Sequence, residues 1–202
     1  MYIRLTQVLF QLLLMLVWTV LFISTSKSIG YLETNTSKPS YEFIDSLQNV
    51  DKKNAYLVNF SKRIETGKIV VSFSDRRLYY VFSRGHAISY PISAPRKDSR
   101  WHGILRISRK RVNPPWTPTS EMRAENPRLP DFVSGGHPRN PLGNRALYLG
   151  SSLYRIHGTD SPSSIGRSIS KGCIRMHNRH IADLYNRVHV GSQVIVTWKS
   201  YK

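Results

Sequence analysis

Prolines are concentrated in one part of the sequence, and this limits what the chain can form there. Seven of the 11 prolines lie between Val112 and Gly143, together with the pair Gly135-Gly136. Proline lacks an amide hydrogen and disrupts both helix interiors and central strands. We therefore expect neither a regular helix nor a central strand over residues 112–143. An irregular stretch of about 30 residues inside a compact domain is typical of a lid or a binding loop.

The sequence on both sides of this stretch has the composition of β-strands. β-branched and aromatic residues fill 69–73 and 78–82, and the turn-forming run 74–77 separates them, which predicts a β-hairpin. Further strands are expected at residues 87–92, 103–108, 146–149, 154–157 and 193–198.

One helix is predicted after these strands. Asn178 is expected to cap it, because apolar residues follow at helical spacing: Ile181, Leu184, Tyr185 and Val188. The sequence therefore predicts a mainly β domain with a few short helices over residues 67–198.

An uncharged and mostly apolar run covers residues 5–23, after Arg4. Its length lies between the apolar stretch of a signal peptide and a membrane-spanning helix, which needs about 20 residues. We interpret residues 1–28 as a hydrophobic helix that is either a signal peptide or a membrane anchor. Residues 29–66 are less hydrophobic and are interpreted as a spacer, with short helices expected at residues 41–47 and 55–64.

Basic residues outnumber acidic ones by 30 to 12, which gives a formal charge of +18. Such a chain attracts nucleic acid, anionic lipid or a carboxylate-rich polymer. The basic residues form no basic helix, zinc-finger spacing or aromatic RNA-binding motif, so no nucleic-acid partner is expected. His177 and His180 have only Asp183 as a further ligand at suitable spacing, so we expect no metal and no cofactor.

The single cysteine, Cys173, lies in a segment with the residue types that thiol catalysis needs. A lone cysteine forms no intramolecular disulfide and no four-thiolate metal site. His157 ends a predicted strand sixteen residues earlier, and a turn-rich segment joins the two. An imidazole within hydrogen-bond reach takes the thiol proton and returns it to a leaving amine. This pattern favours a catalytic pair over a buried cysteine and a core histidine.

The neighbours of the pair fit the same chemistry. The carbonyl of Gly158 is expected to orient the imidazole. Gly172 leaves backbone N–H groups unobstructed, and these groups, with the amide of Cys173, are candidates for an oxyanion hole. Arg175 is two residues beyond Cys173, so it shares a strand face with it and is expected to hold a substrate carboxylate.

Two segments of the chain together carry a known signature. His-Gly-Thr-x-x-Pro-Ser-Ser-Ile-Gly, followed by Ser-Lys-Gly-Cys-Ile-Arg-Met-His-Asn, resembles the motif of the L,D-transpeptidases (the YkuD-type catalytic domain), and the similarity covers residues 68–197. It implies a β-sandwich-like catalytic fold with the cysteine at the base of a cleft. Carried onto this sequence, it implies Cys173 as nucleophile, His157 as acid and base, and Gly158 as the orienting carbonyl. It also implies that Ser170, Gly172 and Arg175 belong to the surround of the cysteine, in which Ser170 and Arg175 are expected to bind substrate.

The resemblance also implies a substrate and a place in the cell. Members of this family attack the third residue of a peptidoglycan stem peptide, usually diaminopimelate, and release D-Ala from a thioester intermediate. Another stem as acceptor gives a 3→3 cross-link, a lysine of an envelope protein gives a tethered protein, and water gives a carboxypeptidase. These acceptors stay open, as does a non-enzymatic wall-binding scaffold. The expected location is the periplasm or cell envelope, with membrane contact if the N-terminal segment is retained.

One segment departs from the family pattern. Many members carry Pro-Thr-Pro-x-Gly before the strand that precedes the long loop, whereas this chain has Asp98-Ser99-Arg100-Trp101-His102-Gly103. The region shapes the cleft, so the preference for donor or acceptor is left open. Trp101 and Trp116 flank the long loop and are expected to pack in the core, with stacking on a substrate as the alternative.

Overall fold

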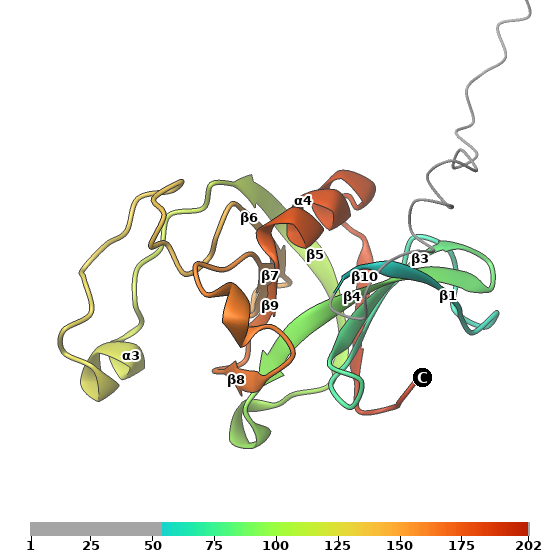
Figure 1. The fold of residues 1–202 in the computed structure, drawn as a ribbon, viewed down its shortest axis with the longest axis horizontal. Coiled ribbons are helices and arrows are strands. Elements are labelled where there is room, and N and C mark those ends of the chain that lie inside the picture. Colours follow the sequence, from blue (N-terminus) through green and yellow to red (C-terminus); the bar gives the residue numbers. More distant parts are fainter. Residues whose placement is uncertain (1–53, 202) are drawn as a thin grey trace, which may run out of the picture. The chain divides into compact units, whose positions relative to one another are not determined.

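The computed structural model describes residues 54–201, drawn as a coloured ribbon in Figure 1. Within this range the chain forms ten strands, two α-helices and two short 3₁₀ helices. The strands are β1 (Tyr56–Asn59), β2 (Ile69–Ser72), β3 (Arg77–Ser83), β4 (His86–Pro95), β5 (Gly103–Val112), β6 (Arg145–Leu149), β7 (Arg155–His157), β8 (Ser168–Ser170), β9 (Ile174–Met176) and β10 (Gln193–Thr197). The helices are η1 (Lys97–Ser99), α3 (Ser120–Glu125), η2 (Pro162–Ser164) and α4 (Asn178–Arg187).

The strands form two sheets that share two long members. One sheet has the order β1-β4-β3-β2-β10-β5, and the other continues as β5-β6-β7-β9 and returns to β4. β4 and β5 are each ten residues long, so each of them pairs with strands of both sheets. Most neighbours are antiparallel, but β2 with β10, β7 with β9 and β4 with β8 are parallel. The mainly β fold with a few short helices is confirmed for the described residues.

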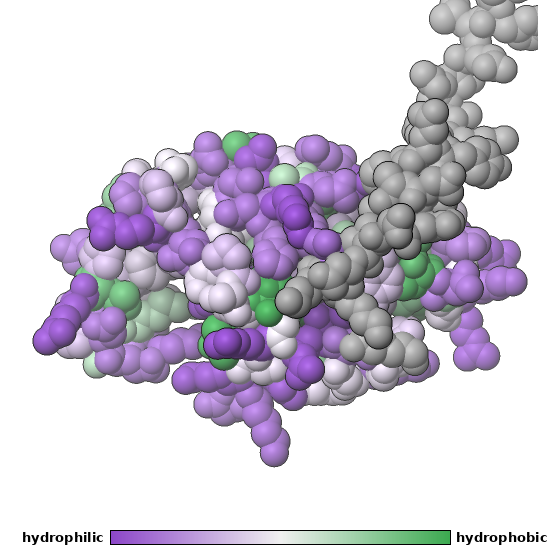
Figure 2. Space-filling model, in the orientation of Figure 1, coloured by the Kyte–Doolittle hydropathy of each residue, from purple (hydrophilic) through white to green (hydrophobic). Residues whose placement is uncertain are grey.

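The core lies between the sheets and under α4. Alternate residues of the strands, among them Ile69, Leu78 and Ile92, are fully buried, and Ile181 and Leu184 of α4 join the same cluster. Burial of one apolar side chain of this size stabilises the fold by about 1.5–3 kcal/mol. On the face drawn in Figure 2 the surface is mostly hydrophilic, and apolar side chains appear only as separate small groups.

The seven strands and the helix expected from the sequence are present, but three details differ. Residues 55–64 form no helix, because Tyr56–Asn59 pairs with β4 as an edge strand and this tertiary pairing overrides the local pattern. Asn178 is the first residue of α4 rather than its cap, and the capping position is His177. The proline-rich loop contains α3, a six-residue helix, because no proline lies between Pro118 and Pro127.

The proposed N-terminal helix, and the short helix expected at 41–47, lie outside the described residues. Among residues 54–201 no helix is long and apolar enough to cross a membrane.

The end of the described chain is held by a buried carboxylate. Asp75, only 4% exposed, accepts hydrogen bonds from the hydroxyls of Tyr79 (2.8 Å) and Ser200 (2.6 Å) and from the backbone N–H of Tyr201 (2.8 Å). Burial raises the pKa of Asp75, but the donors around it outweigh burial and hold the pKa below its ordinary value of 3.8. The ring of Tyr201 also stacks on Phe60, with centroids 4.8 Å apart.

We expect Asp75→Asn to destabilise the protein by about 1–3 kcal/mol at pH 7, because donors that face a carboxylate then face an amide. The folded pKa is lowered, so the carboxylate contributes stability above its unfolded pKa and loses it as pH falls through the folded pKa. Urea unfolding of the wild-type protein and of Asp75→Asn, at pH 7 and at pH 3, measures the free energy of unfolding of each. If the two proteins differ in this free energy by the same amount at both pH values, the role given to Asp75 is contradicted.

Candidate active site

The parallel pairing of β7 with β9 brings the two candidate catalytic residues to one face of the sheet. Ile156 pairs with Ile174 and His157 pairs with Arg175. Alternate residues of a strand face the same side. The side chains at 157 and 175 therefore share a face with Cys173, which precedes β9, whereas Ile156 and Ile174 are fully buried in the core on the other side.

This face borders a cavity of about 910 Å³. The sheet contributes Arg155, His157, Cys173 and Arg175 to its lining. The opposite wall comes from the proline-rich loop, and includes Trp116, Met122, Leu129, Pro130, Phe132, Val133, Pro141 and Leu142. The loop that the proline pattern singled out thus lines the cavity, as expected of a binding loop.

The loop has its own internal support. Asn140 is 1% exposed, and its side-chain amide donates to the carbonyls of Pro114 (2.9 Å) and Ser134 (3.0 Å). Its Oδ1 accepts from the backbone N–H of Leu142 at 2.9 Å. One buried side chain therefore ties the two ends of the loop together, which holds the wall of the cavity in place.

His157 has a fixed tautomer and a low pKa. Its Nδ1 donates to the carbonyl of Gly158 at 2.7 Å, which leaves Nε2 as the basic nitrogen. Burial lowers the pKa of His157 to about 3, and the charge of Arg175 acts in the same direction. The imidazole is therefore neutral at pH 7, the state that a general base requires.

Cys173 is protonated at rest. The residue is only partly exposed, and its Sγ lies 3.7 Å from the carbonyl oxygen of Leu153. Burial raises the pKa of the Cys173 thiol, while hydrogen bonding from Arg155 and the charges of Arg155 and Arg175 act against this rise. At rest the cavity is therefore lined by a neutral Cys173 thiol and a neutral His157 imidazole.

The backbone before Cys173 is held from three sides. Gly172 has φ +115°, and its carbonyl accepts from Nε1 of Trp101 at 2.9 Å. The ring of Trp101 stacks on Tyr154 at 4.4 Å, and a Cβ at position 172 would lie 2.7 Å from Tyr154 Cε1. The hydroxyl of Ser170 donates to the Cys173 carbonyl. Glycine is therefore required at 172 both for its backbone angle and for the space beside Tyr154.

Ser170 and Trp101 thus have structural contacts in the cysteine loop. The substrate-binding role expected for Ser170 stays a prediction, although the residue lines the cavity. Trp101 packs as expected, but its N–H bond to Gly172 was not foreseen, because the two residues are 71 positions apart.

Asn178 holds the loop after His157. Its Oδ1 accepts from the N–H of Thr159 (3.0 Å), and its Nδ2 donates to the Thr159 carbonyl (2.9 Å). A Cβ on Gly158 would lie 2.1 Å from the same Oδ1. Asn178 therefore fixes the peptide whose carbonyl orients His157. Asn178 is the last residue of the signature quoted above, but the sequence pattern assigns it only helix capping, so the pattern gives no sign of this positioning role.

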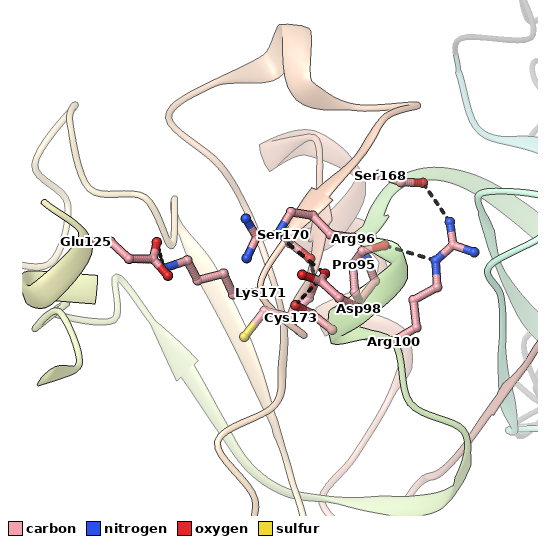
Figure 3. Close-up of polar contacts among 10 residues, drawn as sticks. Pro95, Arg96, Asp98, Arg100, Glu125, Ser168, Ser170, Lys171 and Cys173 are labelled. Atoms are coloured by element: carbon pink, nitrogen blue, oxygen red, sulfur yellow. Dashed lines mark hydrogen bonds and ion pairs between the residues drawn. The ribbon is translucent and has the colours of Figure 1, made fainter. Parts of the chain in front are cut away.

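Figure 3 shows how charged residues surround the cysteine loop. Lys171 makes an ion pair with Glu125 of α3, which links the loop before Cys173 to the opposite wall of the cavity. Arg100, from the segment that departs from the family pattern, donates to the Pro95 carbonyl (3.2 Å) and to Ser168 Oγ (3.3 Å). The departing segment thus packs directly against the strands that lead into the site.

Within residues 54–201 no group of three or more histidine, cysteine, aspartate or glutamate side chains is arranged to hold a metal ion. His177 and His180 lie with ring centroids 5.2 Å apart, and His180 is buried against Tyr90.

The neutral state of the pair has a measurable consequence. Because the pKa of the thiol is raised, the rate of alkylation of Cys173 by iodoacetamide is expected to increase with pH, with a midpoint above that of free cysteine. Mass spectrometry of samples quenched at set times, from pH 5 to pH 10, measures this midpoint. A midpoint near or below pH 6 would instead indicate a resting thiolate–imidazolium pair and would contradict the electrostatics described above.

Comparisons with known proteins place this geometry in a family. Residues 66–196 match the family described as the YkuD L,D-transpeptidase catalytic domain. The Escherichia coli K12 proteins named probable L,D-transpeptidases YbiS and ErfK/SrfK are each 40% identical over 134 residues, which is 62% of this chain. The match covers 43% and 42% of those proteins, so this chain corresponds to less than half of their length. A putative L,D-transpeptidase of Fuscovulum blasticum is 40% identical over 132 residues, covering 63% of this chain and 68% of that protein.

Solved structures share the fold. The Ldtfm–avibactam carbamoyl enzyme has a TM-score of 0.54 at 17% identity, covering 68% of this chain and 51% of that chain. The catalytic domain of an Enterococcus faecium L,D-transpeptidase acylated by ertapenem has a TM-score of 0.51 at 17% identity, covering 66% and 98%. With the sequence match over residues 66–196, the chain belongs to the YkuD L,D-transpeptidase catalytic domain family.

Proposed function

We propose that this chain is a cysteine L,D-transpeptidase of the cell envelope, which cleaves the bond between diaminopimelate and D-Ala in a stem tetrapeptide and forms 3→3 cross-links. The observation that carries the proposal is the position of Cys173 and His157 on one sheet face, both lining one large cavity. The family to which the chain belongs and the names of its relatives support the same chemistry.

The proposed reaction has two halves. Nε2 of His157 takes the thiol proton of Cys173, and the sulfur attacks the carbonyl carbon at the L-centre of diaminopimelate. The C–N bond to D-Ala breaks, and the imidazolium gives its proton to the leaving amine, which leaves a thioester on Cys173. An acceptor amine then attacks the thioester, His157 takes a proton from that amine, and the proton returns to the sulfur.

The backbone around Gly172 is suited to stabilise the oxyanion formed in both halves. A trans peptide is planar, and its C=O and N–H point in opposite directions. The carbonyl of Gly172 is bound by Trp101, so the N–H of Cys173 is directed away from Trp101. We assign this N–H to the oxyanion, where a fixed backbone donor contributes about 3–4 kcal/mol in comparable enzymes.

The charges of the cavity suit an acidic donor. Four cations line it, Arg139, Arg155, Lys171 and Arg175, against two carboxylates, Asp160 and Glu125, and Glu125 is already paired with Lys171. We assign Arg175 to a carboxylate of the stem peptide, because a guanidinium binds carboxylates through two parallel hydrogen bonds. Peptidoglycan lies outside the cytoplasmic membrane, so the proposal requires export, and we assign that task to residues 1–28.

Loss of the nucleophile tests the proposal. With purified disaccharide tetrapeptide as donor and acceptor, Cys173→Ala is expected to reduce 3→3 dimers and released D-Ala by at least about 10³-fold. Mass spectrometry of the products measures both, and omission of the acceptor separates transfer to an amine from transfer to water. Thermal unfolding of the variant serves as the control for folding. Wild-type levels of dimer from Cys173→Ala would refute the assignment.

A further inference from the structure

A second basic residue, Arg155, lies beside the nucleophile. Arg155 begins β7, and the parallel register of β7 with β9 places it next to the position of Cys173, two residues before the pair of His157 with Arg175. Arg155 shares the cavity-facing side of the sheet with both catalytic candidates, and it lines the same cavity.

The guanidinium of Arg155 is held in place by the neighbouring strand. Tyr148 on β6 pairs with Arg155 in the sheet, and its ring centroid lies 5.2 Å from Cζ of Arg155. Arg109 on β5 pairs with the other side of Tyr148, and its Cζ lies 4.1 Å from the same ring. Tyr148 therefore holds Arg155 against the sheet through a cation–π contact, and Arg109 makes a separate contact with the same ring.

One hydrogen-bond donor of Arg155 is unpaired among the described residues of the resting protein. Its Nε is buried and has no hydrogen-bond partner among the described residues. A buried donor without a partner costs about 1–3 kcal/mol. Buried polar groups of native proteins are nearly always hydrogen-bonded, and the few exceptions include groups that take part in catalysis. The unpaired Nε of Arg155 is therefore a donor that remains available to a group that becomes charged during the reaction.

The charges around Cys173 and His157 indicate which of the two groups Arg155 favours. Hydrogen bonding from the backbone and side chain of Arg155, and its charge, all favour the ionised form of the Cys173 thiol. The same positive charge disfavours the protonated form of His157. A guanidinium that stabilises the thiolate and opposes the imidazolium acts on the sulfur rather than as a partner of the histidine.

We propose that Arg155 is a catalytic residue, which donates a hydrogen bond to the Cys173 sulfur as the thiol proton moves to Nε2 of His157. In this step the S–H bond breaks, an N–H bond forms on the imidazole, and the negative charge left on sulfur is balanced by the guanidinium. The inference rests on the proposed function, because a thiolate has a role in catalysis only if Cys173 attacks a substrate. Of the two arginines that favour a charge on the sulfur, it assigns Arg155 to the sulfur and Arg175 to the substrate.

The pH dependence of alkylation of the full chain by iodoacetamide tests this role. An opposite charge within about 4–6 Å shifts a pKa by about 1–3 units, so Arg155→Gln is expected to move the midpoint for Cys173 upward by about one unit or more. Arg109→Gln is the matched control, since it removes an arginine from the same tyrosine ring, one strand further from the sulfur, and it is expected to leave the midpoint unchanged. An unchanged midpoint in folded Arg155→Gln overturns the proposal.

A measurement on the unmodified arginine decides the matter if Arg155→Gln fails to fold. The ¹⁵N-coupled Nε–H resonance of Arg155 in the wild-type protein is expected to shift with pH at the midpoint found for alkylation, and the shift is expected to vanish in Cys173→Ala. A resonance that does not follow the ionisation of Cys173 overturns the proposal.

Neither readout needs peptidoglycan. If wild-type protein makes no product from stem peptides while the midpoint still shifts in Arg155→Gln, the proposed function fails and the contact with the sulfur stands. If the wild-type protein is active and the midpoint does not shift, only the role of Arg155 fails.

Discussion

The pairing of β7 with β9 is the contact on which the site depends. Parallel neighbours present residues of the same register to the same face, so His157 beside Arg175 brings the imidazole and the cysteine loop together. β9 also pairs with β4, which both sheets share, so β9 is held by a neighbouring strand on each side. A slip of one residue between β7 and β9 would turn His157 toward the core and destroy the site.

Burial and nearby charges have opposing effects on the pKa of Cys173, whereas both lower the pKa of His157. Burial keeps His157 neutral and raises the pKa of Cys173, so the resting protein carries no ion pair at its centre. Arg155 and Arg175 favour a charge on sulfur but oppose one on the imidazole. In the proposed mechanism the Cys173 thiol is therefore unreactive alone and ionises when a substrate carbonyl is present to accept the new bond. Asn178 holds the loop that follows His157, and Trp101 holds the loop that precedes Cys173.

Much of the fold and the centre of the site can be predicted from the sequence. β-branched runs predict the long strands, and the motif around Cys173 points to His157, Gly158 and Gly172 as its neighbours. β8 and β9 are three residues long and carry too little pattern to be recognised. The helix predicted over residues 55–64 is wrong because the pairing of Tyr56–Asn59 with β4 is a tertiary contact.

The residues that the sequence does not reveal share a physical cause. Trp101 and Asn178 act through hydrogen bonds to backbone groups, at Gly172 and Thr159, and the sequence carries no signal for such contacts. Arg155 is adjacent to the recognised motif, but its position beside the sulfur depends on the register between two strands. A pattern of residue types points to the candidate reacting groups, whereas their supports are defined only by the folded chain.

Formation of the thioester tests the central claim most directly. Intact-mass spectrometry after mixing with disaccharide tetrapeptide follows the mass of the acyl group added to Cys173 over time, at pH 7. Removal of a general base costs about 10²–10⁴-fold, so His157→Gln is expected to acylate slower by that factor, while His180→Gln, a buried histidine outside the cavity, keeps the wild-type rate. Acylation of His157→Gln at the wild-type rate would show that the His157 imidazole takes no part in activating the Cys173 sulfur.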